Sequence, residues 1–310
     1  MPGIDTKGLG LFLGLAFGIG VPAQLVLLFT GILSIGEPTL FSLAALILVC
    51  LAPGLFALIA RTQAPLPEDD ASIVWPLPQW PALRIVATIP LVFLAINLLC
   101  YAIGWTAPDW SLTPLMSQIT PYIEQSNPDF VKSDGMAMMP AAMMVSAFVL
   151  AVIMGMTLFA AVALGSEYGW RGYLLPKLLP LGTVAALLLS GLAFVLWYSP
   201  LVFYFHLADN GGAQYLFADM VHFVGIGLIF SAVLGGIWLR TRHIGLVALA
   251  LGSWAAHDML LWEQLFSSTH RIVEGPFHDI FFTGNWGLVA MAVWLVVACV
   301  PGLLVARTKA

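Results

Sequence analysis

Five ionisable residues stand inside or at the ends of long apolar stretches, where a charge is costly and usually serves a function. Glu167 and Arg171 are four residues apart, so on a continuous helix they share a face and can pair. His257 and Asp258 lie together near the middle of one later stretch, and His222 lies in the stretch before it. Such a set could perform acid–base catalysis, or could bind zinc through His257, Glu167 and His222.

Each of these residues also has a purely structural interpretation. The Glu167–Arg171 pair could end a span as an interfacial ion pair. His257 could be a hydrogen-bonded core histidine, His222 could be an interface residue, and His243 is expected to be solvated. Ser166 adds a third chemical alternative, a nucleophilic pair with His257.

The elements that position these residues are apolar. The chain has 310 residues, of which 61% are hydrophobic and 9% charged, whereas a soluble domain averages about 25% charged residues. So few charges cannot cover a water-facing surface, which indicates an integral membrane protein. The net charge of −5 argues against nucleic acid as a partner. Three cysteines, Cys50, Cys100 and Cys299, have no metal-binding spacing and are expected to be small core residues.

About eight stretches are long enough to cross a bilayer, which needs about 20 apolar residues each. They run approximately over residues 9–35, 39–60, 83–105, 136–164, 181–206, 217–240, 244–265 and 284–306. The first is too long for a signal peptide and is expected to be a retained span. The predicted fold is a single all-α polytopic membrane bundle, with spans one to three in residues 1–135 and the remaining spans in 136–310. A short surface helix is predicted between Ser117 and Gln125.

Basic residues indicate the orientation, because cytoplasmic loops are enriched in them. With the N-terminus in the cytoplasm, nine of the 11 basic residues fall on that side, and only Lys132 and Arg271 fall outside. An even number of spans then places both termini in the cytoplasm. The expected location is a bacterial inner (plasma) membrane.

Residues 165–176, with the sequence GSEYGWRGYLLP, resemble the first motif of the CPBP family. This family comprises intramembrane CAAX-processing and bacteriocin-processing proteases, also known as Abi proteins. Residues 194–198 stand where its second motif, Phe-x-x-x-His, is expected, and residues 257–261 stand at its third, His-x-x-x-Asn. The resemblance covers about 140–265. It implies an eight-helix fold, a metalloendopeptidase-like activity and prenylated or otherwise apolar peptide substrates.

Three of the four catalytic positions that the resemblance implies are replaced. Ser166 stands at the water-activating glutamate, Tyr198 at the second-motif histidine and Leu261 at the asparagine that helps stabilise the oxyanion, and only His257 is retained. Glu167 and Arg171 match the family positions that hold the site together, and the motif glycines suit close helix packing.

These replacements predict a large loss of activity. A general base contributes on the order of 10²–10⁴ in rate, and an oxyanion donor about 10²–10³. The first hypothesis is therefore a degenerate family member, a pseudoenzyme that binds or regulates lipidated or membrane-embedded partners. The second is an active intramembrane endopeptidase with a rearranged site, in which Glu167 replaces the missing base. The third is a transporter or lipid-handling protein.

The catalytic hypotheses share a geometric expectation. Spans four to seven should surround a polar cavity lined by Glu167, Arg171, Tyr198 and His257. Because Glu167 follows the expected end of span four, that helix should end deep in the bilayer, or the segment near Gly182 should be re-entrant.

Overall fold

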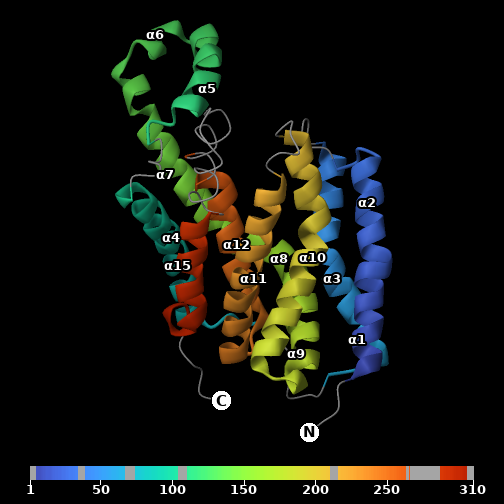
Figure 1. Ribbon diagram of the computed structural model, residues 1–310. Coiled ribbons are helices and arrows are strands. Elements are labelled where there is room, and N and C mark those ends of the chain that lie inside the picture. The colour runs from blue at the N-terminus through green and yellow to red at the C-terminus, as the bar shows by residue number, and fades with distance from the viewer. Residues whose placement is uncertain are drawn as a thin grey trace.

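The computed structural model describes residues 5–33, 39–66, 74–103, 110–209, 216–262, 265 and 287–305. Regular secondary structure within these ranges is helical, with no β-strand, and it forms a polytopic bundle (Figure 1). The predicted all-α membrane fold is confirmed. The short joint between the first two predicted spans, Gly36 to Pro38, lies outside the described residues.

Seven helical segments of the described chain are long and apolar enough to cross a membrane. An eighth apolar helix, α15, is shorter in the described residues. The seven are α1–η1–α2 (Thr6–Leu13, Gly14–Gly20, Val21–Phe29), α3 (Leu40–Gln63), α4 (Gln79–Ala102), the run from α7 to η4 (Asp134–Leu181), α10 (Thr183–Asp209), α11 (Leu216–Thr241) and α12–η5 (Ile244–His257, Asp258–Trp262), and α15 is Leu288–Cys299.

The fourth span differs from the prediction. Instead of ending near residue 164, the chain stays helical through α7 (Asp134–Met156), α8 (Leu158–Glu167), η3 (Tyr168–Leu174), α9 (Leu175–Leu178) and η4 (Leu179–Leu181). Thr157, with φ −114° and ψ −90°, separates α7 from α8. The next helix begins after Gly182, whose φ of +97° is a conformation that glycine adopts without strain. Glu167 therefore lies inside a helical segment, and no deep helix end or re-entrant loop is needed.

Two helices occupy the centre of the bundle. α12 packs against α8, α7, α4 and α11, and α3 packs against α8 and η3. In Figure 1, α1–α3 form one side of the bundle and α4 with α15 the other, so α8 and α12 lie between them. The motif segment thus has helix neighbours on several sides, which shields its charged residues from lipid.

Glycines bring α3 and the motif helix close together. A Cβ atom on Gly54 would overlap the carbonyl group of Gly165, and one on Gly169 would lie 2.5 Å from the carbonyl oxygen of Pro53. The prediction that motif glycines serve close packing is confirmed for Gly165 and Gly169.

Helices α1 and α9, each of which carries or adjoins basic residues, meet at the lower end of the bundle in Figure 1. Arg84 Nη2, near the start of α4, donates to the Gly302 carbonyl in η6 (Pro301–Leu303) at 2.9 Å. Lys177 Nζ in α9 lies 2.5 Å from Asp5 Oδ2, just before α1. The first bond places the start of α4 beside η6, and the second places the start of α1 beside α9. They agree with a one-sided distribution of basic residues, and which compartment this end faces stays a prediction.

The opposite end carries two short helices that project beyond the bundle (Figure 1). α5 (Thr113–Ser126) confirms the predicted surface helix, and α6 (Pro128–Val131) follows it.

Two predictions made elsewhere in the chain are corrected. Cys299 is exposed and Cys50 only partly buried, which leaves Cys100 as the one buried cysteine. His243 is buried because its ring accepts a hydrogen bond from the Leu246 N–H and caps α12.

Candidate functional site

Glu167 and Arg171 form a fully buried ion pair. Arg171 Nη1 donates to Glu167 Oε1 at 2.7 Å, and neither side chain is exposed. Arg171 Nη2 also donates to Ser231 Oγ on α11 at 2.7 Å. The guanidinium carbon lies 4.7 Å from the centre of the Phe194 ring on α10. The predicted sharing of one helix face is confirmed, and the pair joins α8 and η3 to two other helices.

Beside this pair, two hydroxyl groups meet. The Ser166 and Tyr198 hydroxyl oxygens are 2.9 Å apart, across the interface between α8 and α10. The Tyr198 ring packs against Phe194 with ring centres 5.0 Å apart, so both pairs belong to one cluster.

His257 faces other neighbours. Its Nδ1 lies 2.8 Å from the Ser253 carbonyl oxygen, which can only accept, so Nδ1 carries the proton in this bond. The ring stacks on Phe93 of α4 at 6.4 Å and meets the edge of Phe148 of α7 at 5.8 Å. His257 is fully buried, and its Nε2 has no hydrogen-bond partner among the described residues.

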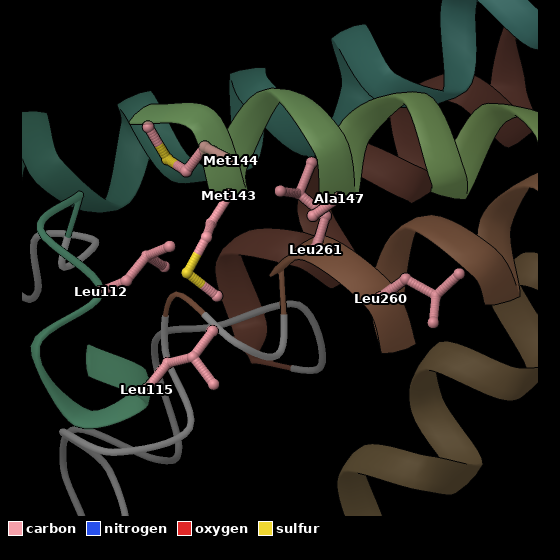
Figure 2. A pocket seen from close by; sticks show the side chains of 7 residues that line it. All are labelled: Leu112, Leu115, Met143, Met144, Ala147, Leu260 and Leu261. Atoms are coloured by element: carbon pink, nitrogen blue, oxygen red, sulfur yellow. The ribbon is translucent and has the colours of Figure 1, made fainter. Parts of the chain in front are cut away.

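Leu261 stands in a small apolar pocket of about 70 Å³ between α5, α7 and η5. Figure 2 shows it beside Ala147, with Met143 reaching into the same space from α7. The pocket lining is Leu112, Leu115, Met143, Met144, Ala147, Leu260 and Leu261. None of these side chains can donate a hydrogen bond, so this wall offers no side-chain donor to an oxyanion.

The hypothesised zinc ligands are not brought together. No group of three or more His, Cys, Asp or Glu side chains is arranged to hold a metal in the part of the chain that the structure describes. His222 on α11 and Asp258 at the start of η5 are both buried, but neither joins His257 and Glu167 in such a group. The donor set therefore does not fit a protein zinc site, which needs at least three ligands.

The four side chains expected to line a polar cavity fall into two groups. Glu167, Arg171 and Tyr198 lie in one packed cluster, while His257 packs among aromatic rings from α4 and α7. None of the four is an exposed side chain. Pockets lined by Leu261 and by Asn97 lie elsewhere in the described structure. Whether the four side chains share a polar cavity stays a prediction.

Sequence reasoning missed several residues of this region. The rings of Phe93, Phe148 and Phe194 pack against the motif residues, the Ser231 hydroxyl accepts from Arg171, and the Ser253 backbone carbonyl accepts from His257. Ser231 carried the only signal, a hydroxyl in an apolar span, and that signal is weak because serine is common at membrane helix contacts.

Comparison with known proteins matches part of the chain to a family model. Residues 138–257 match the family model described as type II CAAX prenyl endopeptidase Rce1-like. The match runs from α7 to the end of α12 and includes Ser166, Glu167, Arg171, Tyr198 and His257. Over this stretch the chain is similar to the CAAX proteases. No curated protein and no solved structure matches the chain. Leu261, which the resemblance places at the family's asparagine, lies just beyond the matched region.

Proposed function

We propose that this CAAX-protease-like membrane protein is impaired in peptide hydrolysis and acts by binding a lipidated or membrane-embedded partner. The observation that carries the proposal is the bond between Ser166 and Tyr198. These two hydroxyl groups occupy the positions at which the family has a glutamate and a histidine. Neither is basic near pH 7, so the pair lacks the base that would activate a water molecule.

The surroundings of Glu167 support the same proposal. For Glu167 to act as a replacement base it would have to leave Arg171, which is fully buried. Breaking a buried ion pair leaves an uncompensated charge and costs about 3–5 kcal/mol. The ion pair with Arg171 thus holds the Glu167 carboxylate in place and supports a structural role for it. The apolar side chains of the pocket around Leu261 also supply no hydrogen-bond donor to an oxyanion.

One observation favours the alternative, an intramembrane endopeptidase with a rearranged site. Glu167 Oε2 and His257 Nε2 are both buried, and neither has a hydrogen-bond partner among the described residues. Each is an acceptor that a substrate or a water molecule could satisfy. In this alternative, Glu167 or His257 takes over the role of base, and substitution of either abolishes cleavage.

The partner that we propose follows from the family and the membrane setting. It is a prenylated or otherwise apolar peptide, or a membrane protein, in contact with the lipids around the bundle. We place the chain in a bacterial inner membrane with both termini in the cytoplasm, on the basis of its basic residues at one end of the bundle.

A cleavage and binding assay on the purified protein in detergent separates the two functions. The substrate is a quenched-fluorescent prenylated CAAX peptide, with the same peptide lacking the prenyl group as the control. We expect no more cleavage from the parent than from His257→Ala, but tighter binding of the prenylated peptide than of the control.

The variant S166E/Y198H/L261N restores the family residues and extends this test. We expect it to cleave the peptide faster than the parent, because it regains a base and an oxyanion donor. Parent cleavage that disappears in both Glu167→Gln and His257→Ala would reject the impaired enzyme and establish the rearranged site.

A further inference from the structure

A buried amide lies outside the motif cluster, near the end of α4. Asn97 is 1% exposed, and its Nδ2 donates to the Phe93 carbonyl oxygen at 2.7 Å. Because that carbonyl can only accept, the amide NH₂ group must face it. The remaining polar atom, Oδ1, has no hydrogen-bond partner among the described residues. An unsatisfied buried acceptor is destabilising, so a ligand that donates to Oδ1 would remove this penalty.

Asn97 lines a pocket of about 150 Å³ together with Leu98, Tyr101 and Trp110. These last three side chains are 55%, 65% and 45% exposed, so the pocket opens on the outer surface of the bundle. This volume resembles that of an engineered cavity that accepts benzene. It suits a small polar group rather than a whole lipid molecule.

Aromatic rings pack against one another in and behind the pocket wall. Trp110 meets Trp262 edge to face at 6.3 Å, and Trp262 stacks on Phe93 at 6.1 Å. Asn97 lies five residues before Ala102, where α4 ends. Tyrosine and tryptophan are enriched at the level of lipid headgroups, so this end of α4 is the depth at which a headgroup meets the protein.

An exposed apolar stripe leads away from the pocket along the same helix. Leu91, Leu94 and Leu98 recur at helical spacing and are 61%, 36% and 55% exposed. Residues three and four apart share a helix face, so the stripe is continuous with the pocket. It offers an acyl chain a path along α4 toward the middle of the membrane.

We propose that this pocket binds a membrane lipid whose headgroup carries a hydrogen-bond donor, either a hydroxyl or an ammonium group. The donor bonds to Asn97 Oδ1, the headgroup packs against Tyr101 and Trp110, and one acyl chain lies on Leu91, Leu94 and Leu98. This lipid site is independent of the proposed function, because it uses none of the residues of the motif cluster.

Native mass spectrometry of the full chain tests the site with three lipids that have identical acyl chains. Phosphatidylethanolamine offers an ammonium donor, phosphatidylglycerol offers hydroxyl donors, and phosphatidylcholine offers none. We expect at least one donor lipid to bind about fivefold more tightly than phosphatidylcholine, the value of one hydrogen bond of about 1 kcal/mol. Preference for one donor lipid identifies the donor group, and preference for both shows that either is accepted.

Asn97→Leu should abolish the preference, whereas Gln24→Leu, which removes another buried amide in α2, should keep it. If Asn97→Leu does not fold, Trp110→Ala tests the site instead, because Trp110 forms part of the pocket wall but lies outside the spans. We expect Trp110→Ala to weaken binding of the donor lipid. The proposal is overturned by equal binding of all three lipids, which would assign Asn97 to water. An unchanged preference in the variant that removes Asn97 or Trp110 would overturn it as well.

Discussion

The hydroxyl oxygens of Ser166 and Tyr198 lie 2.9 Å apart and join α8 to α10. This hydrogen bond is neutral, since neither hydroxyl group is a base near pH 7. Under the proposed function, it keeps the two helices in contact at the place where the family's acid–base pair would stand.

Removal of either hydroxyl is expected to destabilise the bundle slightly. Ser166→Ala and Tyr198→Phe should show a coupling of about 0.6 kcal/mol, and at most about 1.7 kcal/mol, as measured for hydrogen bonds between membrane helices. A double-mutant cycle on unfolding in mixed detergent measures this coupling. Tyr122→Phe on the exposed face of α5 serves as the control and should leave stability unchanged. Strictly additive effects of the two substitutions would show that the bond contributes nothing.

The buried ion pair should respond differently to single and double substitution. Arg171→Met or Glu167→Gln alone should lower the free energy of unfolding by about 3–5 kcal/mol, because each leaves a buried charge unpaired. The variant E167L/R171M should lose much less than the two single losses added together, because it removes both charges. Detergent unfolding curves of the three variants test this expectation. A double variant as unstable as that sum would argue that packing, rather than charge, dominates the site.

Close approach of α3 to the motif helix should make Gly54 sensitive to a single methyl group. Gly54→Ala places a Cβ against the backbone of Gly165, and such overpacking costs about 1–3 kcal/mol. Gly10→Ala in α1 is the matched control because nothing lies within 4 Å of its added Cβ. That change should leave stability equal or raise it by up to about 1 kcal/mol, since alanine favours helix. Equal melting temperatures for the two variants would refute the close contact.

The bond between Asp5 and Lys177 should make stability depend on pH. The hydrogen bond from Lys177, followed by the Gly8 N–H, lowers the pKa of Asp5 below its ordinary value of 3.8. A lowered pKa means that the contribution is complete above pH 3.8 and disappears as the pH falls through the folded pKa. Asp5→Asn should therefore melt at a lower temperature than the parent at neutral pH.

Melting curves of the parent and Asp5→Asn across the acidic range measure this linkage. The difference between them should be constant from neutral pH down to the ordinary aspartate pKa and should shrink below it. A difference that grows as the pH falls would have the opposite sign and would exclude the Asp5–Lys177 bond as its source.

Much of the fold followed from composition and local spacing. Apolar runs of about 20 residues predicted the spans, because lipid requires every backbone polar group to be bonded within a helix. The four-residue spacing of Glu167 and Arg171 predicted their pairing, which needs only helix geometry. Span four was placed too short, since the charges of this pair were interpreted as the end of the apolar segment. Partners from α10 and α11 allow those charges to stay inside.

The candidate site divides in the same way. The sequence by itself predicted that Ser166, Tyr198 and Leu261 replace family residues. That prediction compares residue types along the chain and requires no coordinates. Only the tertiary structure decided that His257 packs between Phe93 and Phe148 and that Asn97 opens on an outer pocket. Those relationships depend on how helices rotate against one another. The rotation is set by the packing of side chains from segments far apart in the chain, which no local pattern records.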